Sequence, residues 1–420
     1  MDQPSRASPY VVVSSLVGPG GAPRHTADMI RALVAADHPV SIIETRNAVL
    51  APLLADLNIS CTHLPLPEDG TAQSLFTAWR RALKPYRGAR AQRTHRLILP
   101  RCAGGCSLAI LLALRSLFPR LYTIEHTMPD VLHHGGWRPV PDLQRRRSLG
   151  WRGKRWLEAH CLHRSIAVCQ AVRDAVIQTY ALPADLVRAC PNWVDVERFV
   201  PDDEAGRAIR RQLGLAPEAF VVGYLGRLSR EKRLDLLVRG FVAFAAAQHR
   251  PVALLLVGNG PLEQALHKLV AQLGAGELVH FVPWIDNAPA WYNAMDLLAL
   301  TSATEGLPLV VLEAMACGRL VLAPPVGGVR ECLDDQVSGF VVAMDQPEQV
   351  AAALTAIAAL PQARREEIAV AARAIAFARF RPQVALAQLL TALDAIPAAR
   401  RAAQALAPID RKVIHTESRA

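Results

Sequence analysis

The stretch TSATEGLPLVVLEAMACG, residues 301–318, joins a polar loop to an apolar run. Its pattern is the strongest indication of the fold and of the site in this chain. Small polar residues come first, Gly306 and Pro308 mark a turn, and the apolar run ends at a glycine. This pattern predicts a loop that leads into a buried helix. Glu305 precedes the predicted helix and Glu313 lies inside it, so both carboxylates can face one pocket at the helix N-terminus. The unpaired N–H groups at that end favour an anionic ligand.

Each of the two glutamates also has an ordinary interpretation. Glu305 can be a solvated loop residue or a cap, and Glu313 can be one more helix glutamate. The setting of Glu313 favours a functional interpretation, because a helix this apolar is mostly buried and a carboxylate near its middle needs a partner. Both glutamates are therefore candidate site residues.

The segment EGLPLVVLEAMACG resembles the paired-glutamate motif of the retaining nucleotide-sugar glycosyltransferases of family 4, in which seven residues separate two glutamates. This resemblance implies the GT-B fold, an α/β architecture with two Rossmann-like domains that face each other across a cleft. It implies that Glu305 lies near the transferred sugar, with Gly306 and Leu307 beside it in the donor site. It also implies that Glu313 accepts hydrogen bonds from the ribose hydroxyls.

Length and composition agree with two domains. The chain has 420 residues, 51% of them apolar, which is enough for two cores. The segment PNWVDVERF, residues 191–199, resembles the linker element of the family, with Trp193 in place of the usual glycine, and a polar run follows it. The sequence predicts an acceptor-side domain at 1–195, a nucleotide-sugar-binding domain at 196–380, and a helix that crosses back, with a tail, at 381–420.

A strand, a glycine turn and a helix start open the first half. Residues 10–16 contain a run of three valines, Gly20 and Gly21 follow, and a helix is predicted from His25, which is the opening of a Rossmann-like unit. A simple tight turn gives the same pattern. The resemblance implies that both glycines approach the donor diphosphate and the acceptor. Pro23 departs from the family, which places a charged residue there.

Three further strands are predicted in the first half, at 39–43, 96–99 and 120–124, with helix-length segments between them. The last of these strands ends at Glu125 and His126. Ligand contacts concentrate at the carboxyl ends of parallel strands. The resemblance implies that His126 reaches the donor sugar, and a histidine in a surface loop is the alternative.

The second half restarts the α/β pattern. A strand at 220–225 leads into GRLSREKR, residues 226–233. Basic residues at a strand-to-helix junction suit a diphosphate, because helix N–H groups and cations act on the same oxygens. A solvated turn is the alternative. The segment resembles the G-R-x-x-x-x-K element of the family, which implies that Arg227 and Lys232 hold the phosphates and stabilise their charge during transfer.

Later segments complete the predicted donor site. The strand exit LLLVGNG, residues 254–260, places Gly258 near the nucleotide in the family resemblance. Trp284 follows a strand predicted at 279–282 and is a candidate neighbour of the base, with core packing as an equal alternative. The segment PVGGVRE, residues 325–331, also matches the family pattern.

The net charge of +10 predicts a negatively charged partner. Nucleic acid is not expected, because no compact basic-aromatic module, zinc-finger spacing or recognition-helix motif is present. Residues 137–156 combine three tryptophans with seven basic residues. This segment is either a solvated basic helix edge or a surface that docks on an anionic membrane or a glycolipid acceptor.

The eight cysteines are scattered through apolar segments, which is typical of reduced thiols in a cytoplasmic protein. Cys102 and Cys106 lack a second pair at zinc spacing, so no metal is expected, and no cofactor is expected because the nucleotide sugar is a substrate. The amino terminus lacks the apolar region of a signal peptide, and the apolar run at 107–114 is too short to span a membrane. We expect a cytoplasmic protein, either free or peripheral on the cytoplasmic membrane.

The resemblance implies a hexosyltransferase that retains the anomeric configuration. We therefore expect the protein to move a sugar from a UDP- or GDP-sugar to a glycan or lipid-linked acceptor, in the synthesis of cell-surface polysaccharide or glycolipid. A nucleotide-sugar epimerase shares the architecture but turns over the donor without an acceptor. A non-catalytic binding protein of the same shape is a further alternative, although the two glutamates and the Arg/Lys pair argue against it. The donor base, the donor sugar and the acceptor stay open.

Overall fold

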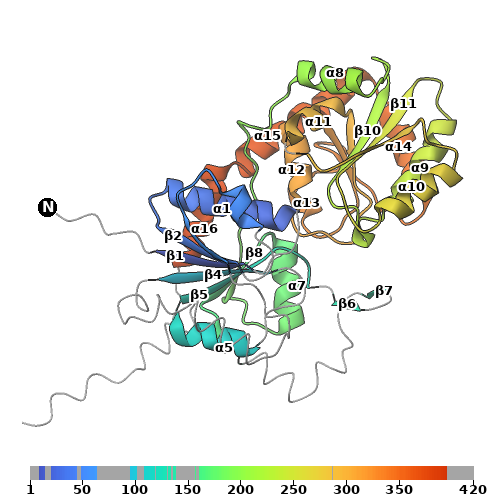
Figure 1. Cartoon of the computed structure of the whole chain (residues 1–420). Helices are drawn as coiled ribbons and strands as arrows, with labels where there is room; N and C mark the ends of the chain where they lie inside the picture. Colours follow the sequence, from blue (N-terminus) through green and yellow to red (C-terminus); the bar gives the residue numbers. More distant parts are fainter. Residues whose placement is uncertain are drawn as a thin grey trace, which may run out of the picture.

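The computed structural model describes two α/β domains, each built on a parallel sheet, and confirms the predicted fold class (Figure 1). The residues described are 9–14, 20–44, 49–63, 95–101, 108–118, 120–129, 131–133, 136–138, 157, 160–285 and 287–394. Among these residues no helix is both long and apolar enough to cross a membrane.

The N-terminal sheet has seven parallel strands in the order β3-β2-β1-β4-β5-β8-β9. Their bounds are β1 Tyr10–Ser14, β2 Val40–Glu44, β3 Ser60–His63, β4 Arg96–Arg101, β5 Arg120–Glu125, β8 Arg164–Ala167 and β9 Val187–Ala189. All the strands predicted in this half are present. The central strands are buried along almost their whole length, because helices cover both faces of the sheet.

Helices of the N-terminal domain lie on both faces of this sheet, and α1 lies on the face turned toward the C-terminal domain (Figure 1). Their bounds are α1 Gly21–Ala35, α2 Leu50–Leu53, α5 Leu108–Leu117 and α7 Gln170–Tyr180. The prediction that α1 begins at His25 was wrong, because the helix starts at Gly21 and includes Pro23. Proline is tolerated there, since an N–H group in the first turn has no intrahelical partner anyway.

A short antiparallel pair, β6 Val131–His133 and β7 Gly136–Arg138, was not predicted. The basic, tryptophan-containing segment at 137–156 lies outside the described residues, apart from the backbone at 137–138 in β7. The proposed membrane contact of this segment therefore stays a prediction.

The C-terminal sheet has six parallel strands in the order β12-β11-β10-β13-β14-β15. Their bounds are β10 Phe220–Leu225, β11 Val252–Val257, β12 Val279–Val282, β13 Leu297–Ala299, β14 Leu320–Ala323 and β15 Phe340–Val341. The helices of this domain are α8 Asp203–Gln212, the 3₁₀ turn η3 Arg230–Lys232, α9 Leu234–Ala246, α10 Glu263–Gln272, α11 Ala288–Ala294, α12 Leu309–Ala316, α13 Val329–Cys332, α14 Pro347–Ala358 and α15 Gln362–Arg379.

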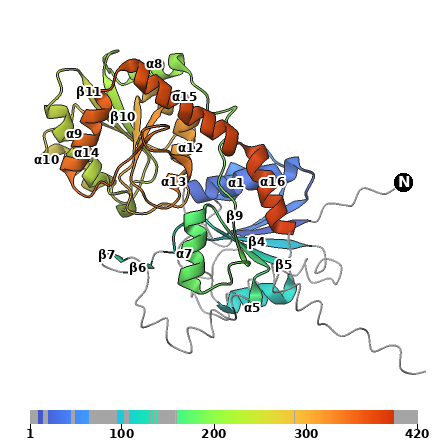
Figure 2. The same ribbon diagram turned by 180° about the vertical axis from the view of Figure 1, so that it is seen from behind.

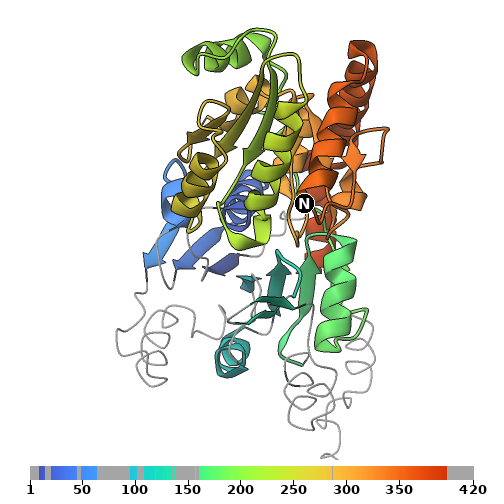
Figure 3. The ribbon, with the colours of Figure 1, turned by 90° about the vertical axis from the view of Figure 1, so that its right-hand side faces the viewer.

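The chain returns to the N-terminal domain through α16, Pro382–Asp394, which follows α15 along one side of the molecule (Figure 2). Tyr122 in β5 donates a hydrogen bond to the Leu393 carbonyl at 2.7 Å, and Arg96 in β4 forms an ion pair with Asp394 at 2.5 Å. The side view in Figure 3 shows the two domains stacked, with α1 between the N-terminal sheet and the C-terminal domain. The carboxyl ends of strands from both sheets are therefore available to one site between the domains.

Candidate active site

A cavity of about 190 Å³ lies between the two domains. All the predicted site residues except Gly258 line it. The lining consists of Gly20, Gly21, Ala22, Arg24, His126, Thr127, Asn192, Tyr224, Leu225, Gly226, Arg227, Lys232, Trp284, Leu300, Glu305, Gly306, Leu307, Pro308, Leu309, Val310 and Glu313. The first turns of both α1 and α12 belong to this lining, so two helix N-termini open on the cavity. Their unpaired N–H groups and partial positive charge suit an anion.

Lys232 and Glu305 form the closest charged pair in the cavity, with 2.7 Å between Lys232 Nζ and Glu305 Oε1. Lys232 ends the η3 turn, and Glu305 lies in the loop before α12. Glu305 is only 9% exposed, which makes its carboxylate dependent on this partner. The pair places a cation and a carboxylate within reach of one bound molecule.

Arg227 follows a tightly packed turn. Gly226 has a φ of 149° and Gly258 a φ of 137°, values that favour glycine. A Cβ built on Gly258 would lie 2.0 Å from the Gly226 carbonyl oxygen. Gly258 therefore packs against Gly226, which lines the cavity, although Gly258 itself does not line it. Tyr224 adds a hydrogen bond of 2.8 Å from its hydroxyl to the Arg227 carbonyl. These contacts fix the backbone that presents Arg227.

Glu313 lies on α12 and is 4% exposed, as the apolar helix predicted, and it has two partners. Tyr292 donates a hydrogen bond of 2.6 Å to Glu313 Oε2. Burial, together with the nearby Glu313 charge, raises the pKa of Tyr292 well above its ordinary value, so the phenol keeps its proton. Arg24 Nη1 lies 3.5 Å from Glu313 Oε1. This contact crosses the cleft, because Arg24 belongs to the first turn of α1.

The sequence interpretation missed Arg24. Pro23 occupies the position at which the family has a charged residue. In this chain the next residue, Arg24, is the charged one. The basic residue beside the Gly20-Gly21 turn was the signal that could have identified it. Asn192 was also missed as a cavity residue, although its segment was recognised as the linker element.

His126 follows β5 and is 6% exposed. Its Nε2 atom lies 3.4 Å from the Thr26 hydroxyl, which donates its own proton to the Ala22 carbonyl at 2.8 Å. The hydroxyl oxygen is therefore the acceptor, Nε2 carries the imidazole proton, and Nδ1 keeps a lone pair. Burial lowers the pKa of His126 to about 4, so the ring is neutral at neutral pH.

This buried, neutral state of His126 predicts a pH dependence of stability. The pKa is about 4 in the folded chain and 6.5 in the unfolded one. Between these values the unfolded chain binds the proton more readily, so the contribution of His126 lowers the free energy of unfolding as the pH falls from about 6.5 to about 4, by up to about 3 kcal/mol. Urea denaturation at pH 7.5 and pH 5 measures this decrease. A His126→Asn variant should lose about 2 kcal/mol less than the wild type between the two pH values; equal losses would refute the buried titration.

The loop before α12 contacts the N-terminal domain and the linker. A Cβ built on Gly306 would lie 2.1 Å from the His126 carbonyl oxygen, so only glycine fits there without movement. Asn192 Nδ2 donates a hydrogen bond of 2.7 Å to the Leu307 carbonyl. These contacts hold the Glu305 loop against the His126 backbone, and both predicted site residues line the cavity, one from each domain.

Trp284 lines the cavity and is only partly buried, so it does not belong to the core. Its backbone N–H donates a hydrogen bond of 2.5 Å to the Asn259 side chain, which belongs to the glycine-rich exit of β11. Two loops that follow neighbouring strands are thus joined at this edge of the cavity.

Two protein-family models match this chain. Residues 19–198 match the model described as Glycosyltransferase Family 4, and residues 206–375 match the model described as Glycosyl transferases group 1. The first matched segment ends between β9 and α8, and the second begins inside α8.

Curated relatives match over part of their length. The D-inositol 3-phosphate glycosyltransferase of Saccharomonospora viridis is 35% identical over 201 residues, which is 46% of this chain and 46% of the relative. The enzyme of the same name from Actinosynnema mirum is 35% identical over 226 residues, 51% of this chain and 53% of the relative. The matches thus span about half the length of these curated relatives.

Solved structures match over nearly the whole chain. Anabaena HepE in complex with UDP-glucose is 23% identical with a TM-score of 0.73, and the match covers 92% of this chain and 99% of HepE. Sucrose-phosphate synthase from Thermosynechococcus elongatus is 21% identical with a TM-score of 0.70, and the match covers 95% of this chain and 100% of that enzyme. At these identities the similarity establishes the shared two-domain fold.

Proposed function

We propose that this chain, whose two halves match glycosyltransferase family models and whose fold is that of the GT-B enzymes, transfers a hexosyl group from a nucleoside diphosphate sugar to a hydroxyl of its acceptor, with retention of the anomeric configuration. The observation that carries the proposal is one interdomain cavity lined by Arg227, Lys232, Glu305 and Glu313. Two cations, two carboxylates and two helix N-termini match the phosphates and the hydroxyl groups of such a donor.

The phosphates are assigned to Arg227 and Lys232. Departure of the nucleoside diphosphate leaves negative charge on the bridging phosphate oxygens, and cations that strengthen their contact as this charge grows lower the barrier. We expect these side chains, together with the helix N-termini, to supply the positive charge, without a metal ion or another cofactor.

The carboxylates are assigned to the two sugar rings of the donor. Glu313 accepts hydrogen bonds from the ribose hydroxyls, held in place by Tyr292, which donates to its other oxygen. Ribose then competes with Arg24 for Glu313 Oε1. Glu305 orients the transferred sugar and stabilises its cationic character, and His126 accepts a hydrogen bond from a hydroxyl of that sugar through Nδ1. Trp284 lies beside the base.

The donor is proposed to be a UDP- or GDP-sugar. HepE, which shares the fold, was solved in complex with UDP-glucose, and this supports a nucleotide-sugar donor here. A glycan or lipid-linked acceptor is proposed, in the synthesis of cell-surface polysaccharide or glycolipid on the cytoplasmic side of the membrane. The curated relatives named for inositol 3-phosphate suggest a second acceptor class, a phosphorylated cyclitol.

Thermal unfolding with UDP-, GDP- and ADP-sugars tests the donor assignment. A ligand at about 100 times its Kd stabilises the folded state by about 2.7 kcal/mol, so one base should raise the Tm more than the others. An Arg227→Ala variant should lose most of that shift. If no nucleotide sugar raises the Tm, or if Arg227→Ala retains the full shift, the assignment is wrong.

Product analysis with and without acceptor separates transfer from epimerisation, because an epimerase needs only the donor.

A further inference from the structure

Glu331 of the C-terminal domain binds a helix of the N-terminal domain. It belongs to the PVGGVRE segment and lies on α13, and both of its carboxylate oxygens accept backbone hydrogen bonds at the start of α7. Oε2 accepts from the Gln170 N–H at 2.8 Å, and Oε1 accepts from the Ala171 N–H at 2.8 Å. A charged acceptor on a helix N-terminus is favourable, because these N–H groups have no intrahelical partner.

The cap that α7 supplies from its own sequence is weak. Its N-cap residue is Cys169, whose sulfur accepts from the Val172 N–H at 3.4 Å, and the first turn contains no acidic residue. Burial raises the pKa of the Cys169 thiol to about 12, so the sulfur stays an uncharged, weak acceptor. Serine, threonine, aspartate or asparagine is preferred at this position. The strong acceptor at the start of α7 is therefore Glu331, which comes from the other domain.

Glu331 is connected to the cavity through a short run of backbone. Gly328, three residues before it, donates a hydrogen bond of 2.7 Å from its N–H to the Gly306 carbonyl. Gly306 packs against the His126 carbonyl, and a Cβ built on Gly328 would lie 3.0 Å from Cys169 Sγ. Glu305 directly precedes Gly306, so the contact on α7 and the Glu305 loop are parts of one interface.

The last helix of the C-terminal domain, α15, also holds Glu331. Arg379, the last residue of α15, donates a hydrogen bond of 2.8 Å to the Glu331 carbonyl. Glu331 is thus fixed through its backbone by α15 of its own domain and through its side chain by α7 of the N-terminal domain. An interdomain contact anchored at both ends is suited to define how the two domains meet.

We propose that Glu331 is a positioning residue, which caps α7 from the opposite domain and thereby keeps His126 and Glu305, one from each domain, in the lining of one cavity. Its effect on sugar transfer rests on the proposed function; its effect on the domain arrangement does not. Without the carboxylate, the N–H groups of Gln170 and Ala171 lose their acceptor, and the closed arrangement that excludes water from the cavity is populated less.

Glu331→Ala and Glu331→Gln test the proposal in the full chain. Amide hydrogen exchange at Gln170 and Ala171 should become at least tenfold faster in Glu331→Ala, and small-angle X-ray scattering without ligand should give a larger radius of gyration. Glu331→Gln keeps one acceptor oxygen and should restore part of the exchange protection. Glu367→Ala is the matched control, because that glutamate pairs with Arg364 within α15 alone.

Measurements of kcat distinguish a role of Glu331 in positioning the site residues from a role in stabilising the fold alone. Glu331→Ala should lower kcat about tenfold with the donor KM nearly unchanged, because the proposed donor contacts lie mainly in the C-terminal domain, and Glu331→Gln should recover part of kcat. Unchanged exchange and scattering would overturn the proposal, and so would wild-type kcat in a variant that only unfolds at a lower temperature. If the wild type transfers no sugar, the proposed function fails, while exchange and scattering still decide the role of Glu331.

Discussion

Lys232→Ala is expected to lower kcat/KM for sugar transfer by about 10²–10³-fold, the loss typical of removing one preorganised donor to developing negative charge. Lys232 lines the interdomain cavity and lies 2.7 Å from Glu305. The substitution removes a cation assigned to the phosphates and also leaves Glu305 without this partner. A nearly buried carboxylate without a partner is costly, and it repels the incoming donor phosphates.

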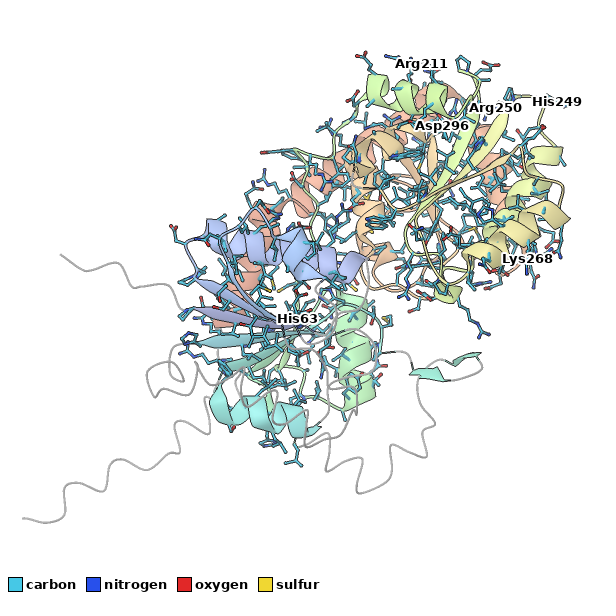
Figure 4. The ribbon with its side chains drawn as sticks, viewed as in Figure 1. His63, Arg211, His249, Arg250, Lys268 and Asp296 are labelled. Carbon is cyan, nitrogen blue, oxygen red and sulfur yellow. The ribbon has the colours of Figure 1, made fainter. Side chains whose placement is uncertain are left out.

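Two variants isolate this effect. Lys268→Ala removes the same charge from the exposed face of α10, away from the junction between the domains (Figure 4), and it should leave kcat/KM unchanged. Lys232→Arg keeps the charge and should retain more activity than Lys232→Ala. Unchanged turnover in Lys232→Ala, or an equal loss in Lys268→Ala, would disprove the phosphate assignment.

Gly306→Ala is expected to lower kcat/KM by about 10²-fold through geometry alone. The added Cβ would lie 2.1 Å from the His126 carbonyl oxygen, closer than real Cβ atoms come to any neighbour. The Glu305 loop or the N-terminal domain must therefore shift by about 1 Å, and a misplacement of that size costs about 10²-fold in rate. Steady-state kinetics with donor and acceptor measure the loss.

Gly276→Ala is the matched control for this substitution. A Cβ at Gly276 meets no atom within 4 Å, so the variant should keep wild-type kinetics. Wild-type turnover in Gly306→Ala would show that the close contact with His126 does not set the geometry of the site.

Much of the fold could be predicted because its signals are local. Apolar runs such as Phe220–Leu225 in β10 and the strands that precede Gly258 and His126 are bounded by glycine and polar residues, and the parallel α/β pattern follows from their alternation with helices. The start of α1 was wrong, since Pro23 looked like part of a turn and was in fact compatible with the first helical turn.

The contacts between the domains could not be predicted from sequence. Arg24 meets Glu313, Gly306 meets His126, and Glu331 meets α7, and each pair joins residues that are far apart in the chain. No local periodicity encodes such a pairing, because it depends on how two sheets from different parts of the chain are placed against each other. The family motifs identified individual residues such as Glu313 and His126. Which residue of the other domain each one contacts is known only from the structure.

The central claim is that one nucleoside diphosphate sugar occupies the interdomain cavity. The most direct test is a crystal structure of the complex with the nucleotide sugar that raises the Tm most. We predict that its diphosphate contacts Arg227 and Lys232, its ribose contacts Glu313, and its sugar lies between Glu305 and His126. A nucleotide bound outside this cavity, or a diphosphate that contacts neither Arg227 nor Lys232, would contradict the claim.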